Sequence, residues 1–117
     1  MTLNERRIGD VTVLDLKGRL VLEDGDAALR ARVNELIEQD RTQIVLNLKD
    51  ITYIDSCGVG VLIAKLVSIR NKGGDLRLLN LTERSRRLME ISQLLNVFAI
   101  FDSESEALSS FMDQTSA

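Results

Sequence analysis

The chain has no histidine and no proline, and Cys57 is its single cysteine among 117 residues. The lack of histidine excludes a Ser-His-Asp triad, a Cys-His pair and histidine metal ligands, so acid–base chemistry would fall to carboxylates, lysines or Tyr53. A single cysteine excludes an internal disulfide, and folding therefore needs no oxidising compartment. These absences predict a protein that is not an enzyme and that has no cofactor and no metal.

Aromatic residues make up 3% of the chain and hydrophobic residues 44%, which predicts one largely aliphatic core. The 15 basic residues are outnumbered by 18 acidic ones, and this balance argues against direct nucleic-acid binding. The first seven residues lack an apolar signal core, and no apolar run approaches the roughly 20 residues that span a bilayer. The sequence therefore predicts a cytoplasmic protein with no membrane partner.

Apolar runs and helical periodicity alternate along the chain. β-branched and aliphatic residues predict strands at residues 11–16, 44–48, 76–81 and 98–101. Apolar residues at helical spacing predict helices over residues 29–37 and 59–69, with Asp24 or Asp26 as the cap of the first helix and Gly73-Gly74 ending the second. This order predicts an α/β fold with a short mixed sheet of about four to five strands covered by about four helices.

Two further helices are predicted in the last third of the chain. Thr82 is a capping residue for the third helix, with Leu88, Ile91 and Leu95 directed inward. Ser103 and Glu106 form a capping-box pattern for the fourth, whose apolar face is Ala107, Leu108 and Phe111. The tail after Met112 is predicted to be loose.

The corner Asp55-Ser56-Cys57-Gly58-Val59-Gly60 lies where a strand should give way to a helix. A hydroxyl there lies beside free backbone N–H groups and at the positive end of the helix dipole. Such a serine can carry a phosphate, bind one, or present a switchable residue to a partner. A helix cap at Asp55 and a nucleophile pair of Asp55 and Ser56 are the other interpretations.

Other candidate sites give weaker indications. Gly58-Val59-Gly60 resembles the start of a dinucleotide fingerprint, but Ile63 occupies the place of the third glycine. Cys57 has no second cysteine and no histidine near it, so we predict a small structural residue that packs. The acidic residues of 23–26 do not follow the spacing of an EF-hand and suit a solvated turn. The arginines at 84, 86 and 87 form a solvated face or meet an anion or acidic partner.

The order of elements and the corner together resemble a known family. The run Tyr53–Gly60 is similar to the Asp-Ser-x-Gly-x-Gly corner of STAS domains of the anti-sigma factor antagonist type. Gly18-Arg19-Leu20, the segment 45–51 and Gly73-Gly74-Asp75-Leu76 resemble three further steps of that family. The resemblance covers about residues 5–112 and implies a single STAS domain over residues 1–117.

The resemblance implies a function. In the family the antagonist binds an anti-sigma factor that is also a serine kinase, and phosphorylation of the corner serine, here Ser56, breaks the complex. The resemblance further implies a monomer or weak dimer, and a surface that includes the outer side of the helix after the corner. Its implied partner-binding residues are Leu22, Glu23, Asp24, Asp55, Ser56, Cys57 and Gly58.

The chain departs from the family at two places, and two other functions stay open. Cys57 stands where serine, threonine or alanine is usual, and the turn at 21–26 leaves the docking acid open between Glu23 and Asp24. The first alternative is a regulatory domain that binds a nucleotide or small molecule, or that serves a transporter or lipid-trafficking complex. The second is a carboxylate-based hydrolase.

Overall fold

The computed structural model describes residues 1–115, with side chains as far as Met112. Five strands and four helices follow one another in this part of the chain, which confirms the predicted α/β fold. In chain order they are β1 (Thr2–Ile8), β2 (Val11–Leu20), α1 (Asp26–Glu38), β3 (Gln43–Ile54), α2 (Ser56–Arg70), β4 (Asp75–Leu79), α3 (Glu83–Ile91), β5 (Ile100–Phe101) and α4 (Glu104–Thr115).

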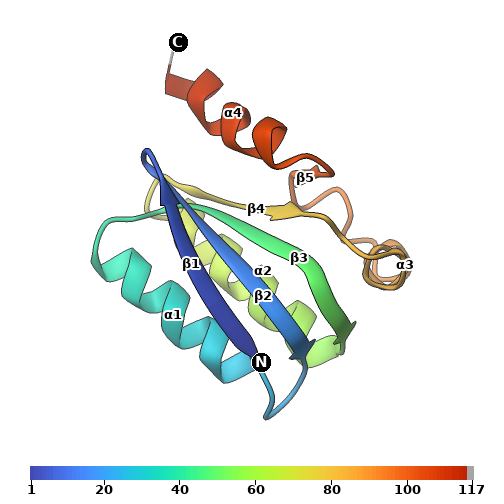
Figure 1. Cartoon of the computed structure of the whole chain (residues 1–117). Helices are drawn as coiled ribbons and strands as arrows, with labels where there is room; N and C mark the ends of the chain where they lie inside the picture. Colours follow the sequence, from blue (N-terminus) through green and yellow to red (C-terminus); the bar gives the residue numbers. More distant parts are fainter. Residues whose placement is uncertain (116–117) are drawn as a thin grey trace.

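The strands form one mixed sheet in the order β1-β2-β3-β4-β5 (Figure 1). β1 pairs antiparallel with β2, and the other three pairs are parallel. Leu20 at the end of β2 is in register with Ile54 at the end of β3. The segments that leave these two strands therefore begin side by side at one edge of the sheet, which is where the sequence places the serine corner.

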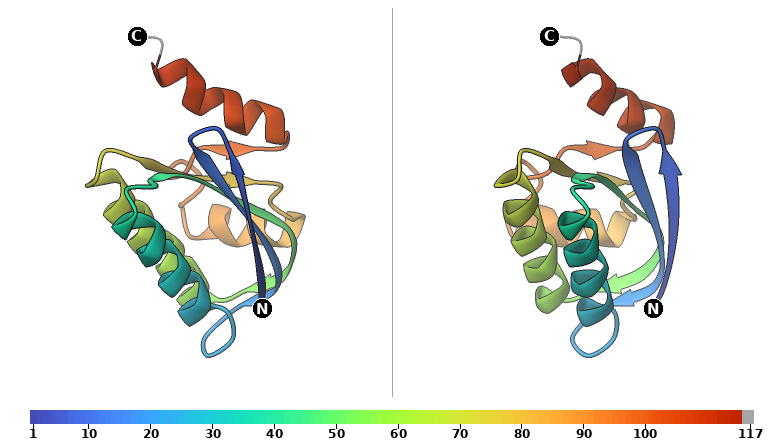
Figure 2. Two further views of the ribbon diagram at one scale, coloured as in Figure 1. Left: turned by 60° about the vertical axis from the view of Figure 1, so that its left-hand side comes forward. Right: turned by 90° about the vertical axis from the view of Figure 1, so that its left-hand side faces the viewer.

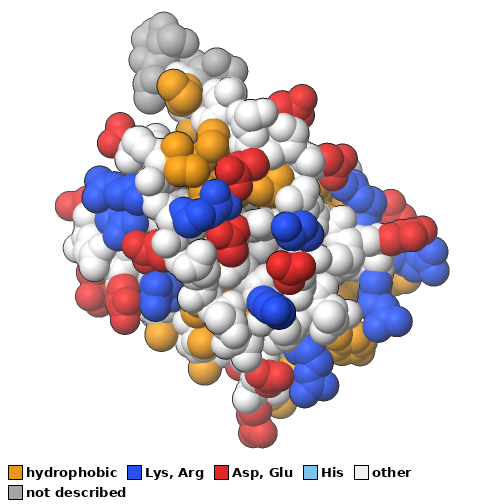
Figure 3. Space-filling model, viewed as in Figure 1, with side chains coloured by type: hydrophobic (Ala, Val, Ile, Leu, Met, Phe, Trp, Pro, Cys, Tyr) orange, Lys and Arg blue, Asp and Glu red, His pale blue; other side chains and the backbone are white. Residues whose placement is uncertain are grey.

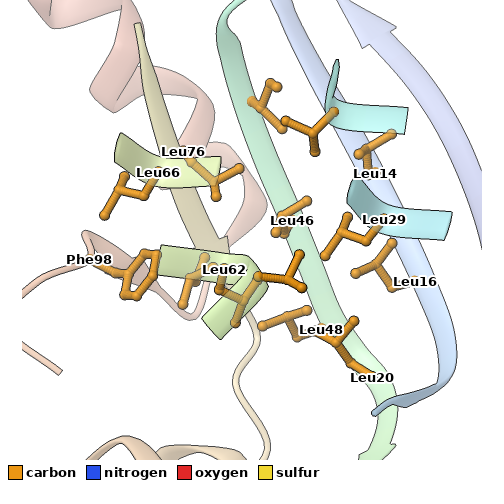
Figure 4. Packing of buried hydrophobic residues seen from close by; sticks show 14 of the residues in the cluster. Leu14, Leu16, Leu20, Leu29, Leu46, Leu48, Leu62, Leu66, Leu76 and Phe98 are labelled. Carbon is orange, nitrogen blue, oxygen red and sulfur yellow. The ribbon is translucent and has the colours of Figure 1, made fainter. Parts of the chain in front are cut away.

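The helices cover both faces of the sheet. α1 and α2 run side by side on one face (Figure 2), and the side chains between them and the sheet are almost all aliphatic (Figure 4). Successive strand residues point to opposite faces, so Val13 and Val45 face the other side, where they pack against Ala107 and Phe111 of α4. Residues 44–46 of β3 are buried on both faces of the sheet, as the continuous apolar run there predicts.

A buried arginine anchors α4 to the sheet. Arg77 of β4 is only 4% exposed, and its Nε donates to Asp75 at 2.9 Å. The same guanidinium donates to Ser110 and lies 3.9 Å from the centroid of the Phe111 ring. Because the charge is paired, hydrogen-bonded and stacked, these contacts offset the desolvation cost of burying it.

Several predicted details differ from the structure. β1 was not predicted, and β3 continues to Ile54 beyond the predicted end at residue 48. Ile91 is 75% exposed, since Ser85 and Met89 occupy the inward face of α3. The final strand is only Ile100–Phe101, because Phe98 turns into the core before it.

The end of the chain also differs from the expectation. Helix α4 continues to Thr115, beyond Met112, where the ordered part was expected to stop. Residues 116–117, the rest of that predicted tail, lie outside the described residues. None of the described helices is long and apolar enough to cross a membrane.

Candidate partner-binding site

Asp55 joins the two segments that leave the sheet edge. It is the N-cap of α2, and its Oδ1 accepts a hydrogen bond from the Gly58 N–H at 2.9 Å. Its Oδ2 accepts one from the Leu22 N–H at 3.1 Å. One carboxylate thus caps the helix and holds the loop after β2 beside the first residue of α2, Ser56.

The two amide donors also act on the ionisation of Asp55. Hydrogen bonds from the Gly58 N–H first, and then from the Leu22 N–H, hold the pKa of the Asp55 carboxyl below its usual range. A lowered folded-state pKa means that Asp55 stabilises the fold above its unfolded-state pKa. This contribution is lost as the pH falls through the lower folded-state pKa.

We expect the amide resonances of Leu22 and Gly58 to follow the titration of Asp55. In a pH series of proton–nitrogen correlation spectra, both should move with one midpoint that lies below the ordinary aspartate value of about 3.9. Asp55→Asn should remove this transition, because the amide side chain does not titrate. A midpoint at the ordinary value, or different midpoints for the two amides, would contradict the bridging role.

Gly58 lets α2 begin in contact with the end of β2. A Cβ at Gly58 would lie 2.1 Å from the backbone oxygen of Leu20 and 3.0 Å from Cγ2 of Ile54. The same Leu20 oxygen accepts a hydrogen bond from the Asp55 N–H at 3.3 Å. No side chain fits in this approach, so the glycine allows the close packing of α2 against β2.

The loop between β2 and α1, residues 21–25, forms a tight turn. Val21 and Asp24 exchange two backbone hydrogen bonds of 3.0 Å, and Glu23 has a φ of 65°, in the left-handed region. The Asp26 carboxylate accepts from the N–H groups of Glu23 and Ala27. The prediction that Asp24 or Asp26 caps α1 is wrong, because Gly25 occupies the N-cap position without a side-chain bond.

The two acids left open as docking residues have different surroundings. Asp24 lies 3.2 Å from the amino group of Met1 and 3.4 Å from Nε of Arg19. Glu23 is exposed and has no ion pair within the described residues. Beside it, the side chain of Leu22 is 59% exposed. The loop therefore presents one apolar side chain and one unpaired carboxylate next to Ser56.

Cys57 is not the packing residue that the sequence predicted. Its side chain is exposed on the first turn of α2, and Gly58 takes the position that faces the strand. The cause is helix geometry, since neighbouring residues lie about 100° apart around the axis and only one of the two can face β2. Cys57 therefore joins Ser56 on the outer surface.

An uncharged strip continues from Ser56 along α2. Gly60 and Ala64 are exposed, and Val67 is 53% exposed. Starting from Ser56, successive residues of the strip are four, four and three positions apart, which places all of them on one face of the helix. A solvated helix face normally carries charged residues, so the uncharged residues at these positions could have indicated a binding face from the sequence alone. We call Leu22, Glu23, Ser56, Cys57, Gly60, Ala64 and Val67 the docking surface.

The acidic turn shows no sign of a cation site. No group of three or more cysteine or acidic side chains within the described residues is arranged to hold a metal ion. Asp26 instead faces the N–H groups of its own turn. The carboxylates of Asp24 and Asp26 therefore have structural partners that account for their positions.

Comparisons with known proteins agree with the fold. The model of the STAS domain family matches residues 2–107. The anti-sigma F factor antagonist of Paenibacillus polymyxa is 31% identical over 99 residues, which cover 84% of each chain. A Thermotoga maritima structure assigned as an anti-sigma factor antagonist superposes with a TM-score of 0.86 and 28% identity, and the match covers 92% of each chain.

A third comparison extends the likeness at the level of the fold. The Bacillus cell fate determinant SpoIIAA, in its phosphorylated form, superposes with a TM-score of 0.74 at 23% identity, covering 94% of this chain and 99% of that one. The sheet, the helical cover and the Asp-Ser corner define a STAS domain. The chain belongs to the STAS domain family, among relatives of the anti-sigma factor antagonist type, which is a type of regulatory binding protein.

Proposed function

We propose that this protein binds an anti-sigma factor with serine kinase activity and is released when that kinase phosphorylates Ser56. The observation that carries the proposal is the position of Ser56. It is exposed at the first residue of α2, between the loop that Asp55 holds and the uncharged strip along the helix. Its relatives are antagonists of anti-sigma factors, and a phosphorylated form has been solved for SpoIIAA.

A phosphate at Ser56 would change binding more than it changes folding. It adds about 1.5 to 2 negative charges. In the free protein these charges stay in water and meet the favourable end of the α2 dipole. In a complex they would be buried in an interface built around a neutral hydroxyl, close to the Asp55 carboxylate, and that burial is costly. Phosphorylation is thus expected to release the partner and leave the fold intact.

Glu23 is the acid that we assign to docking. Its carboxylate is exposed and has no ion pair within the described residues, whereas Asp24 is held by Met1 and Arg19. Leu22 next to it supplies an exposed apolar side chain that a partner can bury. We therefore assign the partner a basic residue that meets Glu23 at this end of the docking surface.

The chain itself supplies no phosphate. It lacks a Gly-Lys-Ser/Thr phosphate-binding loop and has no histidine, so the proposal makes it a substrate and a binding module, not an enzyme. The partner provides the kinase activity. Sigma factors act where transcription occurs, and the proposal therefore places this protein in the cytoplasm without direct contact to DNA.

The test uses the purified kinase-type anti-sigma factor of the same organism, with ATP. Mass spectrometry should locate a single phosphate at Ser56, and phosphorylation should weaken binding at least tenfold, or about 1.4 kcal/mol. Ser56→Ala should bind persistently in the presence of ATP. Ser56→Glu should bind more weakly than the wild type but better than the phosphoprotein, because a carboxylate carries less charge.

Ser92→Ala is the matched control, since Ser92 is also exposed but lies at the end of α3. This variant should be phosphorylated and released like the wild type. A phosphate on another residue, or unchanged affinity after modification of Ser56, would overturn the proposal. The melting temperature should stay nearly constant across the series, and this separates lost binding from lost folding.

A further inference from the structure

Tyr53 and Arg84 form an exposed pair close to the docking surface. Tyr53 lies near the end of β3 and is 45% exposed, although two of the other three aromatic residues are buried. The Arg84 guanidinium of α3 lies 5.9 Å from the centroid of its ring. Figure 3 shows Lys and Arg side chains interspersed with Asp and Glu on the side of the molecule where α3 lies. The pair thus presents an aromatic ring and a cation together.

The charge of Arg84 is not neutralised by the fold. Arg86 lies 3.5 Å from Asp102 and Arg87 lies 3.9 Å from Glu83, but Arg84 has no carboxylate partner within the described residues. Arg84 is also the second residue of α3, where the helix dipole disfavours a positive charge. The positive charge of Arg84 therefore does not stabilise α3. The contact of its guanidinium with the Tyr53 ring limits the conformations of the side chain.

The pair lies within reach of any protein seated on Ser56. Tyr53 precedes Ser56 by three residues, and three residues of chain span at most roughly 10 Å. A standard protein interface covers about 800 Å² on each partner, which is wide enough to include both positions. Tyrosine and arginine are also among the residue types that most often carry binding energy in interfaces.

We propose that Tyr53 and Arg84 form a second contact region of the docking surface and bind a carboxylate-rich segment of the anti-sigma factor. This inference rests on the proposed function, because it places the same partner on a neighbouring surface. The two ends of the interface then have opposite charge, with Glu23 on the β2 side and Arg84 on the α3 side. A partner with the reverse pattern binds in one orientation only.

A nucleic acid fits this region less well than an acidic protein segment. The chain has a net charge of −3, and the exposed carboxylates of Glu83 and Asp102 lie beside the arginines. A phosphate backbone that followed the arginines would meet these two carboxylates. A short acidic segment needs only the unpaired guanidinium and the ring edge of Tyr53 as partners.

The first experiment uses a hexaglutamate peptide as the probe and needs no kinase. Titrated into nitrogen-15 protein at low salt, it should shift the resonances of Tyr53 and Arg84 before all others. Arg84→Glu should reduce this binding at least tenfold. Arg7→Glu, at the opposite end of the sheet, should not, although it changes the charge equally and Arg7 is exposed without an ion pair in the described residues.

The second experiment measures association of the kinase-type anti-sigma factor. Arg84→Glu should slow association about tenfold at low salt, with a smaller difference at high salt, and Tyr53→Ala should accelerate dissociation. Three results would each overturn the inference. The first is equal association rates for Arg84→Glu and Arg7→Glu, and the second is that the peptide shifts other resonances first. The third is tighter binding of a single-stranded oligonucleotide than of the peptide. If Ser56 is phosphorylated and Arg84→Glu still binds normally, this inference fails while the proposed function stands. If no phosphate reaches Ser56, the proposed function fails, and the peptide result is unaffected.

Discussion

Replacing Gly58 by alanine is expected to remove a large fraction of the free energy of unfolding of this domain. The new methyl group would lie 2.1 Å from the Leu20 oxygen, which is backbone and cannot rotate away. Either α2 or the end of β2 must move, and the hydrogen bond from the Asp55 N–H to Leu20 stretches with it. We expect a loss of about 3 kcal/mol, the upper part of the usual range for overpacking.

Thermal unfolding by circular dichroism measures this effect directly. A loss of that size should lower the melting temperature by roughly 10 °C or more. The matched control is Gly60→Ala, two residues later in the same helix, where a Cβ meets nothing within 4 Å. This control should stabilise the helix by about 0.5 to 1 kcal/mol, because alanine loses less backbone entropy than glycine. Similar melting temperatures for the two variants would show that the close approach at Gly58 is not needed.

The sequence predicted the corner well because its determinants are local. A capping aspartate, a serine and a glycine between two apolar runs specify a helix start, and the structure has the cap at Asp55 and the close approach at Gly58. The same logic predicted the cap at Thr82, whose hydroxyl accepts from the Ser85 N–H. These two caps were therefore readable without the fold, whereas the cap of α1 was not, because Gly25 occupies its N-cap position.

Features that depend on distant residues were not readable in this way. β1 has two adjacent arginines and only Leu3 on its inward apolar face, and it is stabilised by contacts with other elements. Arg6 pairs with Asp15 of β2 and Glu104 of α4, at sequence separations of 9 and 98 residues. The Tyr53–Arg84 contact likewise joins two elements that no local pattern connects.

The orientation of a helix about its axis was a third kind of feature that the sequence left undecided. Leu88 packs partly against the core as predicted, and Leu95 does so from beyond the end of α3, but Ile91, which was also expected inward, is exposed. The buried face of α3 is set by Ser85 and Met89, which lie four residues apart. At Cys57 and Gly58, likewise, steric exclusion at Leu20 decides which residue faces inward. Local hydrophobicity alone does not carry that information.

A bulky side chain at Gly60 is expected to prevent partner binding without harming the fold. Gly60 lies one turn after Ser56, is exposed, and has open space where a Cβ would stand. In the proposed complex this space is filled by the partner, because interface cores are as well packed as protein interiors. Gly60→Trp places an indole in that space, so the partner can no longer pack against the docking surface there.

We expect Gly60→Trp to weaken binding of the kinase-type anti-sigma factor at least a hundredfold, or about 2.7 kcal/mol. Its melting temperature should equal or exceed that of the wild type, because tryptophan is a better helix residue than glycine. Glu38→Trp is the control. It adds the same indole at an exposed position, the last residue of α1, which lies outside the docking surface. Isothermal titration calorimetry on the three proteins measures the difference. Full affinity for Gly60→Trp would mean that the partner does not dock along α2, and the docking surface would then have to be confined to the loop and the first turn of the helix.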